Sequence, residues 1–215
     1  MSRMPAAQRR EQLLDTAAEL FAQQGYARAT TSQLAKAAGV TEPIIYRHFK
    51  SKRDLFVALI ERTGEETLEG WREHIAGASD PADRLKRLFG DNPMVQPKGR
   101  AAYRVFLQAI SESDDEAIHK AVDDHLRGVH RFLADALQTA QDAGQVPKRF
   151  APDVLAWLLI DLGLGYGVCS AMEIQGHGRG ADGTHVQEVI ATAMIASPLP
   201  HLRDPSSGDP ADAAG

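Results

Sequence analysis

Two short helical segments joined by a glycine turn, near the N-terminus, constrain this chain more than any other stretch. Thr30 and Gln33 have the spacing of a capping box, which predicts the start of a helix. Gly39 follows the apolar face of that helix, and glycine adopts the left-handed conformation that ends a helix at little cost. Thr41 then predicts a second start, with Pro43 in the first turn, where proline is tolerated.

This arrangement is typical of a helix-turn-helix, in which the second helix enters the major groove of DNA. Ile45 and Phe49 lie four residues apart and are expected in the core. The residues left facing outwards mix small, apolar and cationic groups; they are Thr41, Glu42, Pro43, Ile44, Arg47 and His48, with Tyr46 at the edge. A helical hairpin with no role in DNA binding can contain the same glycine turn, so the motif alone leaves both interpretations open.

The stretch ATTSQLAKAAGV, followed by EPIIYRHFKSKRDLF, resembles the DNA-binding domain of the TetR (tetracycline-repressor-like) transcriptional regulators. The resemblance covers about residues 10–60. Its most specific parts are the paired threonines, the A-x-x-A-G-V turn and the Y-x-H-F-x-S-K block. It implies a protein that binds DNA. It implies nothing about a ligand, because the remaining part of such proteins varies individually.

Each outer side chain has an expected role. In the resembled family, the positions that commonly touch DNA match Thr31, Glu42, Pro43, Ile44, Tyr46, Arg47, His48 and Lys52. Glu42 suits a cytosine amino group, Ile44 suits a thymine methyl group, and Arg47 suits either a guanine edge or a phosphate. Phosphate contacts are expected from Tyr46, His48 and Lys52. Thr31 and Ser32 begin a helix, where an anion is favoured. Ile44 departs from the small polar residue often found there, which leaves base specificity open.

The charge distribution favours DNA binding by the N-terminal part alone. The whole chain of 215 residues has a net charge of −5. Residues 1–62 hold ten Lys and Arg against six Asp and Glu, a net charge of +4, so the remaining residues carry −9. A basic head on an acidic body is expected when only the head meets phosphate, although chance clustering produces the same asymmetry.

Cysteine usage and hydropathy indicate a cytoplasmic protein. The single cysteine, Cys169, excludes an intrachain disulfide and fits a reducing compartment, and no signal-peptide pattern is found at the N-terminus. The most apolar stretch, 154–172, is interrupted by Asp161 and several glycines. We therefore expect it to be a buried helix of a protein with no membrane segment.

The pattern of apolar residues predicts an all-α fold, since no sustained strand alternation is found. The first helix is predicted over 9–24, and a connecting helix runs from Ser51 towards Ile75. Further helices are predicted over 81–89, 100–111, 116–143, from 152 onwards, and over 186–195. The predicted organisation is a flexible arm (1–8), a three-helix helix-turn-helix DNA-binding domain (9–54, extending into the connecting helix to about 75), a larger helical regulatory and dimerisation domain (76–197) and a disordered tail (198–215).

The body is expected to provide a dimer interface and a ligand pocket. The last two helices resemble the pair that, in the same family, forms a four-helix bundle across a twofold axis, and one reading helix covers too few base pairs for tight binding. The expected interface residues are Leu158, Leu162, Gly165, Ile190 and Met194. The expected pocket residues are Tyr103, Phe106, Leu126, His130, Trp157, Tyr166 and Cys169, for which core packing is the alternative.

An enzyme is not predicted, because G-x-S-x-G, H-E-x-x-H and phosphate-loop motifs are absent from the sequence. No cofactor is expected, and the histidines do not have metal-binding spacing. We predict a homodimeric repressor that binds a palindromic operator and is released by a small-molecule effector. The alternative is a DNA-binding protein of the same fold without a ligand, which acts through a protein partner or as an activator.

Overall fold

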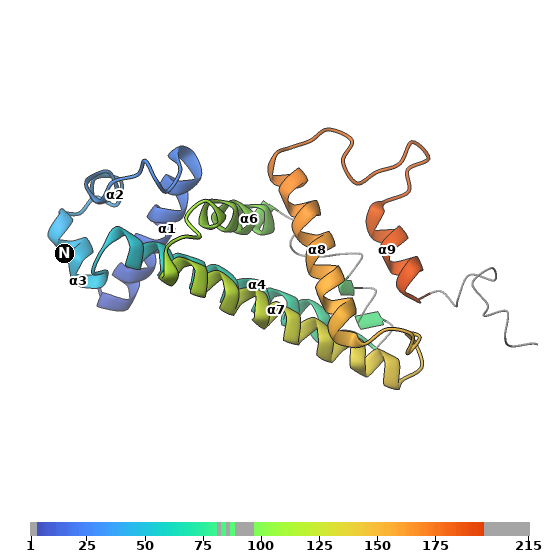
Figure 1. Cartoon of the computed structure of the whole chain (residues 1–215). Helices are drawn as coiled ribbons and strands as arrows, with labels where there is room; N and C mark the ends of the chain where they lie inside the picture. Colours follow the sequence, from blue (N-terminus) through green and yellow to red (C-terminus); the bar gives the residue numbers. More distant parts are fainter. Residues whose placement is uncertain (1–3, 81–82, 85–86, 89–96, 196–215) are drawn as a thin grey trace, which may run out of the picture.

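The computed structural model describes residues 4–80, 83–84, 87–88 and 97–195. The regular structure of these residues is helical, apart from a single bridge between Arg179 and His185, so the predicted all-α fold is confirmed. The helices are α1 (Ala6–Gln24), α2 (Thr31–Ala37), α3 (Glu42–His48), α4 (Lys52–Ala76), α6 (Pro97–Ile110), α7 (Glu116–Asp142), α8 (Pro152–Ala171) and α9 (Val186–Ile195). Helices α1–α3 form a head at one end, α4 and α7 run along the molecule, and α8 and α9 lie at the other end (Figure 1).

Most predicted helix boundaries agree with the structure to within a few residues. The main difference is α1, which begins at Ala6 after Pro5 and therefore takes up the last three residues of the predicted flexible arm. Proline is compatible with this start because the first backbone N–H groups of a helix have no partner within it. The predicted helix over 81–89 is described only at residues 83–84 and 87–88, and the predicted tail over 198–215 lies outside the described residues.

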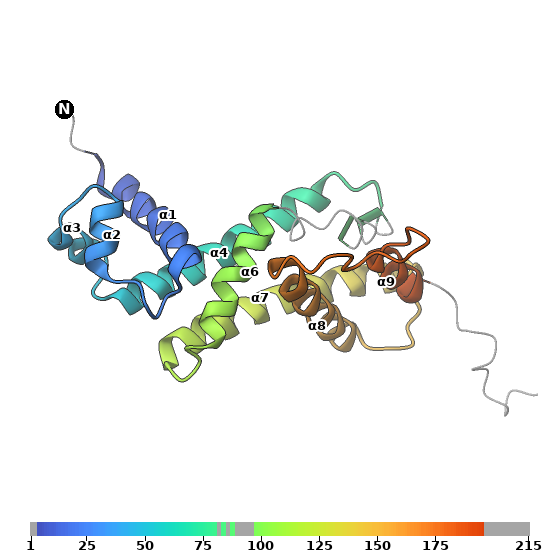
Figure 2. The same cartoon turned by 90° about the horizontal axis from the view of Figure 1, so that it is seen from above.

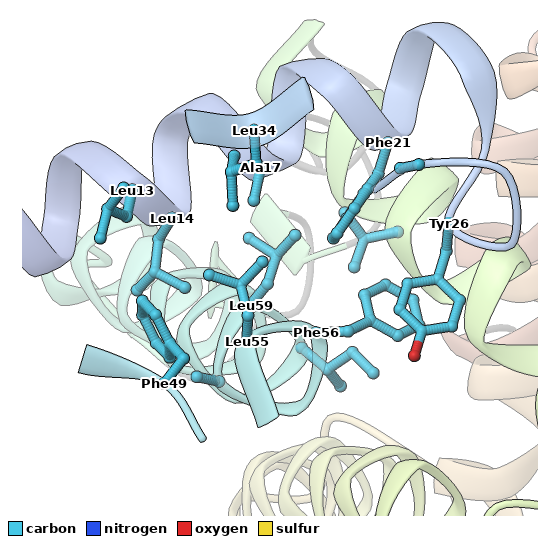
Figure 3. Packing of buried hydrophobic residues seen from close by; sticks show 14 of the residues in the cluster. Leu13, Leu14, Ala17, Phe21, Tyr26, Leu34, Phe49, Leu55, Phe56 and Leu59 are labelled. Carbon is cyan, nitrogen blue, oxygen red and sulfur yellow. The ribbon is translucent and has the colours of Figure 1, made fainter. Parts of the chain in front are cut away.

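The head is built around an apolar cluster between α1 and the first turns of α4 (Figure 3). Three aromatic rings close one end of this cluster. Tyr26 stacks on Phe56 with ring centroids 4.1 Å apart, and Phe21 meets each of them edge-on at 5.5 Å. The same cluster continues into the body through α6 and α7; the body residues in it are Val105, Phe106, Ala109, Ile118 and Ala121. Head and body therefore share one core.

Helices α4 and α7 lie side by side and run in the same direction (Figure 1). Arg53, at the start of α4, forms an ion pair with Asp115 immediately before α7 at 3.3 Å. Near the C-terminal end of α4, the ring of Trp71 lies 5.7 Å from that of Phe132 in the second half of α7. Helix α4 thus runs from the head into the body, where it packs along α7.

Two glycines allow close contact between these helices. A Cβ atom on Gly64 of α4 would lie 2.7 Å from Nδ1 of His125, which is closer than a carbon atom can approach. A Cβ atom on Gly128 of α7 would lie 3.2 Å from a methyl group of Leu68. The His125 ring therefore fits only because position 64 has no side chain.

His125 gives the protein a pH-dependent stability. Its ring stacks on Phe106 at 4.4 Å, and burial lowers its pKa from 6.5 to about 4. As pH falls from 6.5 to 4, His125 binds a proton in the unfolded chain but stays neutral in the folded chain. The contribution of His125 to stability is therefore present above pH 6.5 and is lost towards pH 4. In the wild type, the free energy of unfolding is expected to fall by about 2 kcal/mol over this range because of His125, and in His125→Leu this fall should be absent. Urea unfolding at a series of pH values measures both.

His119→Leu, on the exposed side of the same helix, is the matched control and should leave the pH dependence unchanged. Identical slopes of stability against pH in the wild type and in His125→Leu would show that His125 titrates normally in the folded protein.

Helix α8 differs from the sequence-based expectation. It was predicted to be buried, yet only its inner residues are, and Val154, Trp157, Leu158 and Leu162 are exposed. By length and apolar composition alone α8 also meets the requirements for a membrane span. A helix that is covered by a second subunit meets them equally well.

Candidate DNA-binding interface

The turn between α2 and α3 has the geometry expected from its residues. The predicted capping box is present, since the Thr30 hydroxyl accepts from the N–H of Gln33 at 3.2 Å and the Gln33 side chain accepts from the N–H of Thr30 at 2.9 Å. Gly39 has φ +65°, and the next N–H, from Val40, returns to the carbonyl of Ala35 at 2.9 Å. The left-handed glycine thus sets the direction of α3.

Helix α3 places one face in the core and leaves the other free. Ile45 and the following Phe49 are buried, as predicted. Thr41 occupies the N-cap position, but its side chain makes no capping bond. Among the predicted DNA contacts, the exposed residues are Ser32, Thr41, Pro43, Tyr46 and Arg47, and the half-buried ones are Thr31, Glu42, Ile44, His48 and Lys52.

Three predicted contact residues are joined to one another. The Thr31 hydroxyl donates to the Glu42 carboxylate and lies 3.3 Å from the Tyr46 hydroxyl. This cluster connects the first turn of α2 with both ends of α3. It therefore holds Glu42 and Tyr46 in place before any DNA is bound, which reduces the ordering that binding requires.

Lys52 bonds within the head, to the loop that precedes α2. Its Nζ donates to the carbonyl oxygens of Tyr26, Ala27 and Ala29, at 3.0, 3.2 and 3.1 Å, and lies 4.4 Å from the centre of the Tyr26 ring. An ammonium group has three N–H donors, and all three are used within the head. Lys52 thus braces the loop between α1 and α2, and the predicted phosphate contact stays a prediction.

The arginines of the head divide into engaged and available groups. The guanidinium of Arg10 lies 5.0 Å from the centre of the Phe49 ring, and Arg28 donates to the carbonyl of Gln24 at 2.9 Å. Arg47, exposed in the last turn of α3, forms no hydrogen bond or ion pair with any described residue. Of these three arginines, Arg47 is therefore the one whose guanidinium is available to a ligand such as a DNA phosphate or base.

Trp157 and His130, two of the predicted pocket residues, lie against each other. Trp157 is 41 % exposed and His130 is half-buried, with their tilted rings 4.6 Å apart between centroids. The Nε2 atom of His130 lies 3.1 Å from the carbonyl oxygen of Asp153. The predicted pocket role of these two residues stays a prediction. The exposed carboxylates Asp153 and Asp161 lie four residues before and after Trp157, so they mark the outer side of α8.

The other predicted pocket residues are more enclosed. Phe106 is buried, and Leu126 packs against the core of the body. Tyr166 lies 4.5 Å from the ring of His177 in the loop after α8, and Cys169 is half-buried. The side chain of Tyr103 lies outside the described residues.

Two interior polar groups were missed by the sequence-based interpretation. The indole nitrogen of Trp71 and Nδ1 of His125 are buried and have no hydrogen-bond partner in the described part of the chain. Both residues stand on otherwise apolar helix faces, Trp71 between Leu68 and Ile75 and His125 beside Val129. A polar group at an apolar position of a helix was the feature of the sequence that could have indicated these interior groups.

Three of the five predicted interface residues are exposed, and their role in a dimer stays a prediction. Leu158, Leu162 and Gly165 are exposed on α8. Ile190 packs instead against the core of its own body, while its neighbour Val189 is 55 % exposed and was not predicted. The side chain of Met194 lies outside the described residues.

Comparison with known proteins identifies the family. The model of the tetR family of bacterial regulatory proteins matches residues 13–59, which contain α2, α3 and most of α1. The fatty acid metabolism regulator protein of Bacillus subtilis is 32 % identical over 137 residues, which are 64 % of this chain and 70 % of the relative. This chain belongs to the TetR family. The TetR-family relatives are transcriptional regulators and not enzymes.

Other relatives match this TetR-family chain mainly in the head. The transcriptional activator FasR of Mycolicibacterium smegmatis is 36 % identical over 85 residues, which are 40 % of this chain and 39 % of the relative. The chain thus spans about two fifths of the length of several curated relatives that it matches. A transcriptional regulator from Saccharomonospora viridis, solved in complex with choline, shares the fold with a TM-score of 0.72 at 23 % identity, over 87 % of this chain and 93 % of that one.

Proposed function

We propose that this TetR-family protein is a cytoplasmic, homodimeric repressor that binds a roughly palindromic DNA operator and leaves it when a small molecule binds the body. The observation that carries the proposal is the outer face of α3, where Tyr46 and Arg47 are exposed beside the prearranged Thr31–Glu42 pair. The proposed contacts are Thr31, Ser32, Thr41, Glu42, Pro43, Ile44, Tyr46, Arg47 and His48.

Dimerisation is supported by the apolar face of α8. Val154, Trp157, Leu158 and Leu162 recur at spacings of one, three and four residues and are all at least 41 % exposed. Val189 of α9 adds to the exposed apolar surface. A second copy would cover this surface and bring two heads onto two half-sites of the DNA.

A ligand within the body is supported by an unpaired interior group. The indole N–H of Trp71 is buried without a partner among the described residues and would gain one from an effector with a polar atom among mainly apolar ones. The Saccharomonospora viridis regulator, of the same fold, binds choline. Such a ligand would stabilise a spacing of the heads that no longer fits successive major grooves.

An activator is the second candidate, because the relative FasR is named as one. Both functions need the same DNA contacts, and the activator needs in addition a surface for the transcription machinery. The two functions are distinguished by transcription from the bound promoter in vitro, which falls with a repressor and rises with an activator.

The experiment that tests the proposal is selection of bound duplexes from a random pool by the purified protein at moderate salt. A palindrome bound by a dimer is the expected result, and the recovered duplex then serves to screen for releasing compounds. If no sequence is enriched by a folded protein, the proposed operator binding is wrong for the protein alone.

Two substitutions in α3 separate positioning on DNA from base reading. Tyr46→Ala is expected to weaken binding of all duplexes by about tenfold, since a phosphate contact carries no sequence information. Ile44→Ser is expected to change the preferred base at one position in each half-site, since an apolar contact to a thymine methyl group is lost. Repeated selection with each variant measures both effects. An equal loss on all sequences from both variants would contradict these roles.

A further inference from the structure

Gln108, near the C-terminal end of α6, connects the body to the head. Its Oε1 accepts from the backbone N–H of Tyr26 at 2.8 Å, and its Nε2 donates to the carbonyl of Phe21 at 3.0 Å. Both backbone groups belong to the end of α1 and the turn after it, where helical partners run out. The opposite amide orientation would place donor against donor, so the two bonds define this orientation.

The connection continues from Tyr26 to the start of α2. The carbonyl of Tyr26 is held by Lys52, which also holds the carbonyl of Ala29, next to the Thr30 cap of α2. Hydrogen bonds and the short stretch of backbone between them thus lead from α6 to the residue before the cap of α2. Helix α6 contacts α8 at the same time and therefore lies between the head and the rest of the body (Figure 2).

Arg62 of α4 also binds α1 directly, at 2.8 Å to Asp15 and 3.2 Å to Glu11, but it does not connect the head to α6. The shared apolar cluster holds head and body together, but the hydrophobic effect has no direction. The Arg53–Asp115 ion pair is between partly exposed side chains, and such pairs contribute little. A pair of hydrogen bonds from one planar amide is directional, so it resists rotation of the head about α4.

We infer that Gln108 is a positioning residue that sets the angle of the head on the body and thereby the separation of the two α3 helices in the dimer. The inference rests on the proposed dimeric DNA binding. Adding one base pair between half-sites moves them apart by about 3.4 Å and rotates them by about 35°. A dimer whose heads are held at a fixed angle would bind the altered spacing more weakly. A dimer whose heads are no longer held by Gln108 would bind both spacings with similar affinity.

The test uses the duplex that the wild-type protein selects, together with versions whose half-site spacing is one base pair shorter or longer. Binding is measured by fluorescence anisotropy without any small molecule. The wild type is expected to discriminate between spacings by about tenfold or more, and Gln108→Met by less than about threefold, with little loss at the best spacing. Gln138→Met, on the exposed face of α7, is the matched control and should behave as the wild type.

Gln108→Glu is the second variant, since it keeps the acceptor for Tyr26 and loses the donor to Phe21; an intermediate loss of discrimination is expected. An unchanged spacing profile in a folded Gln108→Met protein overturns the inference. If the wild type selects no DNA, the proposed function fails instead.

A measurement without DNA then decides the inference separately. Spin labels at Lys36→Cys and Thr139→Cys, in a Cys169→Ser chain diluted with unlabelled protein, report the distance from α2 to α7. The distribution should be narrow with Gln108 and broader with Gln108→Met or Gln108→Glu. Equal widths overturn the inference.

Discussion

Lys52→Met is expected to lower the free energy of unfolding by about 3 kcal/mol. The substitution leaves the carbonyls of Tyr26, Ala27 and Ala29 without their charged donor and removes the cation from the face of the Tyr26 ring. Hydrogen bonds to charged groups are among the stronger ones, and water can replace only those that it reaches. Urea unfolding of the purified protein measures the effect.

Lys50→Met is the matched control for this prediction. Lys50 is exposed, and its side chain has no hydrogen bond or ion pair with a described residue, so its loss should leave stability within about 0.5 kcal/mol. The slope of log affinity against log salt should not change in Lys52→Met. Unchanged stability, together with a slope reduced by about one, would instead make Lys52 a phosphate contact.

A carboxylate on the outer face of α8 is expected to abolish the dimer. In Leu162→Glu the charge would be taken out of water between two apolar surfaces without a partner, which costs more than the interface gains. Sedimentation should show a monomer, and affinity for the palindrome should fall by about a hundredfold or more because two linked half-sites become one. Affinity for a single half-site should be unchanged.

Gln138→Glu, on the exposed polar side of α7, adds the same charge and should leave the dimer intact. Leu158→Glu, one turn away from Leu162 on the same face, should repeat the loss. If both leucine variants remain dimeric, the subunits meet elsewhere, and the exposed face of α8 has another partner.

The sequence by itself determined the head, because the signals there are local. The capping box of Thr30 and Gln33, the left-handed Gly39 and the buried pair Ile45 and Phe49 depend on residues within one or two turns of each other. Backbone hydrogen bonding and steric limits act at that range, so residue types and spacing are sufficient to predict them. The type and order of the body helices followed from periodicity in the same way.

Only the tertiary structure decided which side chains act across the chain. Lys52 finds its three acceptors between 23 and 26 residues away, and Gln108 holds an N–H 82 residues away. The same is true of α8, whose exposed side carries Trp157. No periodicity encodes these choices, because they depend on where separate helices meet once the apolar faces are packed.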